Sequence, residues 1–234
     1  MQYRAYALLK PVRDGGIVMR ARDIVSNIIV AVKFCKDRDK ALKEVAALLM
    51  VQQHLNVIHL LDWYDTNDNI GIAIVMPLAD MDLMDFIQTS MFTTVSTLRA
   101  VAEQVAAAVE HVHSCGLVHL DVKPDNVGVV LLESGGMMCK LMDFGSAQSE
   151  LVTGTRIHCT RFYLAPEMLL GMVTPAADVY ALGMTLRALI AQLAENTCGA
   201  AISAAFGELW RAMTREDYFA RPTSGEVVLA VGMI

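Results

Sequence analysis

HLDVKPDN, at residues 119–126, is the stretch that decides how the chain is interpreted, and it follows a helix-like segment that ends in HSCGLVH. Two further motifs come after it, Asp143-Phe144-Gly145 and then Ala165-Pro166-Glu167. Any one of these motifs would be unremarkable in a surface loop, and Asp-Phe-Gly alone is common by chance. All three in this order indicate one chemical site that contains carboxylates, an amide and a lysine.

The three motifs resemble the catalytic loop, the metal-binding motif and the Ala-Pro-Glu motif of the eukaryotic protein kinase family. This resemblance implies a Ser/Thr protein kinase that uses ATP and Mg²⁺ to phosphorylate hydroxyl groups of protein substrates. Asp121 is then the catalytic base at the acceptor hydroxyl, and Lys123 contacts the transferring phosphate. Asn126 and Asp143 are the implied Mg²⁺ ligands, because hard cations prefer oxygen donors.

The same resemblance assigns a nucleotide site to the first third of the chain. Lys33 ends the strand-like segment 29–33 and would hold the α- and β-phosphates, with Glu44 as its ion-pair partner. The alternative for Glu44 is an ordinary solvated helix residue. The other implied positions are Gly16 in the glycine-rich loop, Val18 and Ala31 around the adenine, Met76 as gatekeeper, Leu78 in the connecting segment and Asp82 toward the ribose. For Asp82 a simple acidic turn remains equally open.

Four positions depart from the family pattern. Gly16 aligns with the third glycine of the glycine-rich loop, but Arg13 and Pro11 stand where the other two glycines are expected. Gly128 stands beneath the adenine, where a larger apolar residue is usual, and Leu120 replaces the arginine of the catalytic loop. These departures keep a second hypothesis open, a pseudokinase or scaffold with weak nucleotide binding. A small-molecule phosphotransferase is disfavoured by Asp-Phe-Gly and Ala-Pro-Glu together.

Three structural roles also follow from the resemblance. Thr160 is expected to hydrogen-bond the side chains of the catalytic loop. Glu167 is expected to form a buried ion pair with Arg221, and Asp178 to brace the catalytic-loop backbone. The loss of the catalytic-loop arginine predicts that activity does not need a phosphorylated activation segment.

Hydrophobic periodicity changes along the chain. Short runs rich in Val, Ile and aromatic residues predict strands at 6–9, 16–21, 28–34, 60–64 and 70–76, with one helix at 37–51. Later segments have helical spacing, at 97–113, with Ser96 or Thr97 as N-cap, at 176–194, and in a last short helix within 217–234. The expected fold class is therefore α+β, a two-lobed kinase-like fold with an antiparallel sheet and one helix first and a mainly helical second lobe.

Length and composition bound the remaining possibilities. The chain has 234 residues, 55% of them hydrophobic, and a net charge of −6. We expect a single kinase domain over residues 1–234, with an N-lobe at about 1–76, a hinge at about 77–82 and a C-lobe at about 83–234. Its trimmed loops are similar to those of small viral and other reduced kinases.

Charge and hydropathy also limit the partners. An acidic chain is not expected to bind nucleic acid generally, and no apolar run is long enough to predict a membrane span. Five widely spaced cysteines without a CxxC pair indicate neither a disulfide framework nor a zinc site. We therefore expect an intracellular protein, cytoplasmic or nuclear, whose oligomeric state the sequence leaves open.

Overall fold

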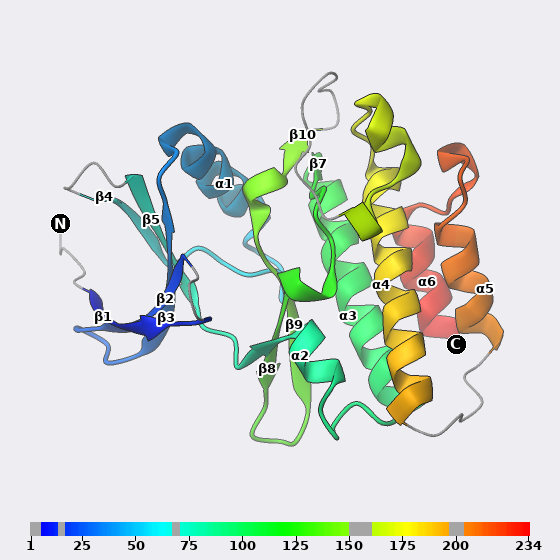
Figure 1. Cartoon of the computed structure of the whole chain (residues 1–234), viewed down its shortest axis with the longest axis horizontal. Coiled ribbons are helices and arrows are strands. Elements are labelled where there is room, and N and C mark those ends of the chain that lie inside the picture. Colours follow the sequence, from blue (N-terminus) through cyan, green and yellow to red (C-terminus); the bar gives the residue numbers. More distant parts are fainter. Residues whose placement is uncertain (1–5, 14–16, 67–70, 150–160, 197–203) are drawn as a thin grey trace. The chain divides into compact units, whose positions relative to one another are not determined.

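A computed structural model describes residues 6–13, 17–66, 71–149, 161–196 and 204–234 (Figure 1). The chain divides into two compact units, one of Met1–Gln53 with Ile58–Ala79 and one of His54–Val57 with Asp80–Ile234. The sequence did not indicate that His54–Val57 belongs to the second unit. This segment forms a parallel bridge from Val57 to Leu141.

The first unit contains one five-stranded antiparallel sheet with the strand order β1-β2-β3-β5-β4. Its strands are β1 (Tyr6–Pro11), β2 (Val18–Asp23), β3 (Ile29–Cys35), β4 (Asp62–Thr66) and β5 (Gly71–Pro77). All five expected strands are present, shifted by one or two residues at their ends. Gly71 has φ of +107°, and a Cβ there would lie 1.8 Å from the carbonyl oxygen of Cys35, so no other residue fits at this strand start.

The helix α1 (Arg38–Val51) completes the first unit. Asp37 is its N-cap, because its carboxylate accepts a hydrogen bond from the backbone N–H of Lys40 at 3.1 Å. The helix packs on β3 and β5 through a buried face that includes Val45 and Leu48. Glu44 lies on the same buried face, which no solvated helix residue would do.

The second unit is mainly helical. Its α-helices are α2 (Leu83–Ile87), α3 (Val95–Ser114), α4 (Pro175–Asn196), α5 (Ala204–Met213) and α6 (Ser224–Met233). Among the described residues, short 3₁₀ helices lie in the segments between the longer elements, namely η1 (Pro124–Asn126), η2 (Phe144–Ser146), η3 (Arg161–Tyr163), η4 (Pro166–Leu170) and η5 (Tyr218–Ala220). The expected α+β class, with a sheet first and helices after it, is confirmed.

The helices α3 and α4 form the centre of this unit (Figure 1). The N-cap of α3 is Thr94, whose hydroxyl accepts the backbone N–H of Thr97 at 3.0 Å, so the expected cap at Ser96 or Thr97 was wrong. In α4, a Cβ on Gly183 would lie 2.8 Å from Met213, which shows how closely α5 approaches.

Two small sheets carry the loops of interest. One has the order β6-β8-β9 and contains β6 (Met81–Asp82), β8 (Val127–Leu131) and β9 (Met137–Leu141). The other pairs β7 (Leu117–Val118) with β10 (Gln148–Ser149). Among the helices of the described residues, none combines the length and apolar character that crossing a membrane requires.

Candidate functional site

Lys33 and Glu44 form a close ion pair in the first unit. The Nζ of Lys33 lies 2.7 Å from Oε1 and 2.8 Å from Oε2 of Glu44. The glutamate side chain is only 3% exposed. A buried carboxylate costs free energy unless it is paired, so α1 and β3 are held together at this point. The ion pair expected from the sequence is therefore present.

Four of the expected nucleotide-site residues share one face of the sheet. Val18 is the cross-strand neighbour of Lys33, and Ala31 is the neighbour of Met76. Because Ala31 and Lys33 are two residues apart on one strand, all four side chains point to the same side. Gly16 lies outside the described residues. Leu78 is half-buried, just beyond the end of β5.

Asp82, in the second unit, has a structural role of its own. Its carboxylate accepts the backbone N–H of Asp85 at 2.8 Å and thereby caps α2. The side chain is buried. A ribose contact would use the same carboxylate, and it stays a prediction.

Asp178 on α4 fixes the backbone of the catalytic loop. It is fully buried, and its two oxygens accept the N–H of His119 at 2.6 Å and of Leu120 at 2.7 Å. His113 contacts the same carboxylate at 3.0 Å. Leu120 has φ of +66°, a left-handed conformation that a non-glycine residue adopts only at a cost of about 1 kcal/mol. The expected brace is confirmed, and it holds the loop in this strained shape.

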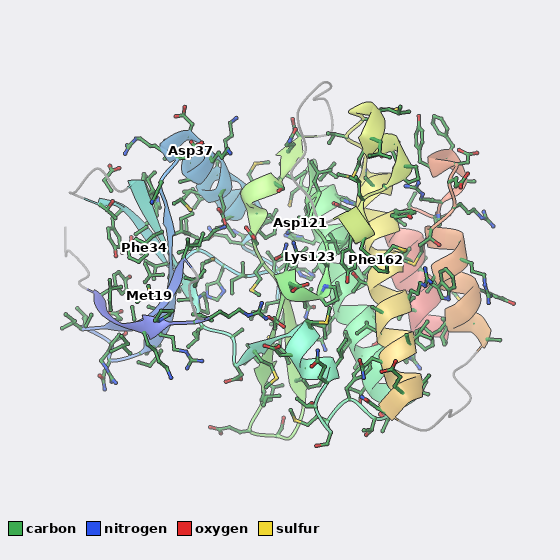
Figure 2. All side chains as sticks on the ribbon, in the orientation of Figure 1. Met19, Phe34, Asp37, Asp121, Lys123 and Phe162 are labelled. Carbon is green, nitrogen blue, oxygen red and sulfur yellow. The ribbon has the colours of Figure 1, made fainter. Side chains whose placement is uncertain are left out.

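Asp121 lies on the braced loop close to Lys123 (Figure 2), and its two carboxylate oxygens have different surroundings. Oδ2 accepts hydrogen bonds from Nζ of Lys123 at 2.8 Å and from Nδ2 of Asn126 at 2.7 Å. Oδ1 is buried and has no hydrogen-bond partner among the described residues. An unpartnered buried carboxylate oxygen is costly, and it is where an incoming hydroxyl would be accepted.

Asn126 is oriented by Asp121. Its Nδ2 also donates to the backbone carbonyl of Asp121 at 2.8 Å, so the amide oxygen points away from these contacts. The carbonyl of Asn126 accepts the N–H of Met142 at 2.9 Å, which places Asp143 one residue beyond this bond. Asp143 itself has φ of +63°.

These residues fit a Mg²⁺ ion. The amide oxygen of Asn126 and the carboxylate of Asp143 are hard oxygen donors, and Mg²⁺ usually takes only one or two protein ligands besides phosphate and water. Within the described ranges, no group of three or more His, Cys, Asp or Glu side chains could hold a metal. A metal that binds with its nucleotide needs no such group.

His119 and Phe144 join the two loops of the site. His119 is fully buried, and its ring lies 4.8 Å from that of Phe144 in an edge-on arrangement. Its Nε2 bonds the carbonyl of Met142 at 3.1 Å, while Nδ1 faces the N–H of Asp121 at 3.3 Å. The loop of Asp121 and the loop of Asp143 are therefore packed as one body.

A second buried ion pair joins η4 to the segment between η5 and α6 in the second unit. Arg221 contacts Glu167 at 2.6 and 2.9 Å, as expected from the sequence. Its remaining donors reach the carbonyls of Arg215, Ala176 and Glu216, at 2.7, 2.9 and 3.3 Å. Thr160, expected to hydrogen-bond the catalytic loop, lies outside the described residues.

Leu120 lies in an apolar environment where the family pattern has an arginine. It is buried in a cluster with Val118, Ala165, Met168, Val173 and Ala177. Nearby, burial raises the pKa of Tyr163, and the negative charge of Asp125 adds to this shift. The Tyr163 phenol therefore stays protonated well above neutral pH.

Sequence patterns missed the anchoring of His54–Val57. Asn56 donates to the carbonyl of Cys139 at 2.9 Å and to Gln104 at 3.0 Å, and Lys140 donates to the carbonyl of Leu55 at 2.7 Å. Burial lowers the pKa of Lys140. These partners are 48 to 85 residues apart, so no local pattern could reveal them.

Comparison with known proteins agrees with this geometry. Residues 14–227 match the family model described as protein kinase domain. The stress-activated protein kinase JNK of Drosophila melanogaster is 29% identical over 79% of this chain and 52% of its own length. Cyclin-dependent kinase 7 of Carassius auratus is 33% identical over 74% of this chain and 53% of its own.

Mitogen-activated protein kinase 15 of Mus musculus is also similar, with 34% identity over 73% of this chain and 34% of its own length. The chain thus spans about half, or less, of the length of the relatives that it matches.

Proposed function

The chain belongs to the protein kinase family, and we propose that it transfers the γ-phosphoryl group of ATP to Ser or Thr hydroxyls of protein substrates. The observation that carries this proposal is the buried, unpartnered Oδ1 of Asp121 beside an Oδ2 that Lys123 and Asn126 already occupy. One carboxylate oxygen is fixed by the protein, and the other is buried without a hydrogen-bond partner among the described residues, so it can accept a hydroxyl that reaches it. Such an arrangement suits a general base that must also orient its substrate.

The proposed step moves one proton and one phosphoryl group. The substrate hydroxyl donates to Oδ1 of Asp121 and gives up its proton there while its oxygen bonds the γ-phosphorus. The bond from that phosphorus to the bridging oxygen breaks, and ADP leaves with the electron pair. Lys123, 2.8 Å from Oδ2, holds the carboxylate in place and supplies a positive charge beside the transferring group.

Asn126 and Asp143 are the residues that would hold Mg²⁺, which when bound neutralises charge on the phosphates. Lys33 would bind the α- and β-phosphates, and its pair with Glu44 fixes its position. Val18, Ala31 and Met76 would enclose the adenine from one sheet face. Gly16, Leu78 and Asp82 complete the proposed nucleotide site.

The family also supports the wider proposals. Lys123 and Thr160 favour Ser/Thr over Tyr acceptors. We treat residues 1–234 as one kinase domain whose substrates are proteins, located inside the cell. The activity, substrates and partners of the whole protein are proposals too, because the chain covers only about half of the length of these relatives.

A pseudokinase or scaffold is the second candidate. Pro11 and Arg13 replace two glycines whose backbone would approach the phosphates, and Gly128 on β8 offers no side chain beneath the adenine. Both changes weaken nucleotide binding without removing a catalytic group.

One experiment separates the two. The protein is incubated with Mg²⁺ and γ-labelled ATP, together with a basic protein and a pool of Ser/Thr peptides, and label on the acceptors is measured. Label on phosphoserine or phosphothreonine supports the kinase. Thermal stabilisation by Mg-ATP without label transfer supports the pseudokinase and contradicts our proposal.

A further inference from the structure

Arg20, in the middle of β2, is a cation to which the proposed function gives no role. Its Nε is buried and has no hydrogen-bond partner among the described residues. The residue as a whole is half-buried, so other atoms of its side chain are accessible. A buried donor without an acceptor costs free energy, so it calls for an explanation in terms of function or of a bound molecule.

The strand register places Arg20 beside residues that are proposed to enclose the adenine. Arg20 is the direct cross-strand neighbour of Ala31 on β3, and Ala31 is in turn the neighbour of Met76 on β5. Directly opposed residues have their side chains on the same face of a sheet, so these three form one row across the strands. The next row on this face, two residues along, contains Val18 and Lys33.

The side chains of Arg20 and Ala31 start close together. The N–H of Asp23 donates to the carbonyl of Ile28, so the odd-numbered residues of β2 form the hydrogen-bonded pairs with β3. Bonded and non-bonded pairs alternate along an antiparallel ladder, and the side chains of a non-bonded pair lie closer to each other. Arg20 therefore leaves its strand next to the methyl group of Ala31.

The opposite face of the sheet contributes to the hydrophobic core of the first unit. The buried cluster on that face consists of Ala21, Val30, Val32, Ala73 and Val75. Ala21 directly follows Arg20, and successive side chains of a strand point to opposite faces. The burial of the Arg20 Nε therefore arises on the face that carries Ala31 and Lys33, and not in this core.

Arg20 also differs from the neighbouring cations in its polar contacts. Lys33 is paired with Glu44, and Arg22, which is exposed, donates to Asn27 at 2.8 Å. The side chain of Arg20 has no ion pair or hydrogen bond with any described residue. A guanidinium group is planar and weakly hydrated, so it stacks well on aromatic rings.

We propose that Arg20 is a further nucleotide-binding residue, which lays its guanidinium group on the purine base. This inference rests on the nucleotide site of the proposed function, which puts the base in the row of Ala31 and Met76. The phosphates belong to the row of Lys33, about 7 Å away along the strands. The aromatic base attracts the cation, and it supplies the contact that Arg20 lacks in the unliganded protein.

Two other roles fit the observations less well. To reach the phosphates, the Arg20 side chain would have to extend past Val18 to the next row, whereas its buried Nε shows that it is packed against the protein. A role in stability alone would need a polar partner for the guanidinium group, and the described residues supply none.

The test measures the binding of Mg-ATP, dideoxyadenosine and tripolyphosphate by isothermal titration calorimetry, for wild type and Arg20→Met. Methionine keeps an unbranched side chain and removes the guanidinium group. We expect the Kd values of Mg-ATP and dideoxyadenosine to rise by the same factor, about threefold to tenfold, because both contain the base. Dideoxyadenosine lacks the ribose hydroxyls, so its response reports on the base. The Kd of tripolyphosphate should not change.

Two further variants sharpen this test. Arg20→Lys keeps the charge but not the planar group, so it should recover the affinity only in part. Arg22→Met is the matched control, because Arg22 lies on the same strand and face but is exposed and bonded to Asn27. It should bind every ligand like the wild type.

Stability and kinetics distinguish a contact with the base from a structural role. The melting temperature of Arg20→Met should not fall, because the guanidinium group has no polar partner in the unliganded protein. In steady-state transfer, this variant should raise the KM for ATP and leave kcat within about twofold, because the base is held equally in the ground state and the transition state.

Three results would overturn the inference. Equal Kd values for wild type and Arg20→Met would show that the residue does not bind the nucleotide. A rise for Mg-ATP and tripolyphosphate alone would assign Arg20 to the phosphates, and a melting temperature lowered by more than about 5 °C with unchanged Kd values would assign it to stability. If the expected changes in Kd occur but wild type transfers no label, the proposed kinase activity fails and this inference stands.

Discussion

The catalytic loop at 119–126 and the first hairpin at 6–28 differ in how their polar groups are used. In the loop, backbone and side-chain groups are bonded to Asp178, Lys123 or Asn126, and one buried oxygen of Asp121 has no partner among the described residues. In the hairpin, apolar and basic side chains face solvent, and two expected glycines are absent. Transfer chemistry needs particular atoms at fixed positions, whereas nucleotide enclosure by a loop tolerates gradual loss of contacts.

The second unit, which contains the catalytic loop, should lose much of its stability when one of its buried ion pairs is broken. Arg221→Leu leaves Glu167 buried without its partner, and we expect about 3–5 kcal/mol loss in the free energy of unfolding, measured with urea. The double variant Glu167→Leu/Arg221→Leu removes both charges and should recover part of that loss. A loss below about 1 kcal/mol for the single variant would contradict the role of this pair.

The hairpin should instead tolerate substitutions, and some of them should improve nucleotide binding. Replacing Pro11 and Arg13 with glycine restores close backbone approach to the phosphates, so the KM for ATP should fall by about threefold to tenfold. Steady-state kinetics measure this, with Arg22→Gly, outside the glycine-rich loop, as the control. An unchanged KM would mean that the missing glycines do not limit nucleotide binding.

A smaller effect concerns how the stability of the protein depends on pH through His54, in the segment His54–Val57. Burial lowers the pKa of His54, helped by His111, whose ring stacks on it at 4.7 Å, while Glu110 opposes the shift. The folded state thus favours neutral His54. The contribution of neutral His54 to the free energy of unfolding is therefore fully present above the ordinary histidine pKa of about 6.5, and it declines as the pH falls below that value.

Urea unfolding between pH 7.5 and 5.5 measures this contribution. The wild type should lose stability toward low pH, and His54→Gln should lose less. Equal slopes for wild type and His54→Gln would show that His54 has no part in it.

The smallest effect is expected in the activation segment. Leu120 packs in an apolar cluster and provides no cation for a phosphate. Alanine at Ser146, Ser149, Thr153 and Thr155 together should therefore leave turnover within about twofold. Loss of turnover in this variant, restored by Asp or Glu at one of the positions, would show that a phosphate switch operates.

The sequence predicted those parts of the molecule that depend on local pattern. The five strands, α1, α3 and α4 follow from hydrophobic spacing. The roles of Asp121, Asn126 and Asp143 come from motifs and stay predictions. The ion pairs of Lys33 and Arg221 came from the family resemblance.

Other features depend on contacts between distant residues. Three features could be seen only in the folded chain, because they join residues far apart in sequence or depend on burial. They are the bond of Asn56 to Gln104, the contact of His113 with Asp178, and the different surroundings of the two Asp121 oxygens. The start of α3 was misplaced because Thr94, Ser96 and Thr97 are all good capping residues.

The most direct test of the central claim compares Asp121→Asn with wild type in single-turnover transfer from Mg-ATP to a Ser/Thr peptide. The account predicts a loss of about 10²–10⁴-fold in the transfer rate, because the base is removed, with Mg-ATP stabilisation retained. Asp39→Asn, on the exposed start of α1, is the matched control and should transfer at the wild-type rate. Equal rates for Asp121→Asn and wild type, or no transfer by either, would contradict the claim.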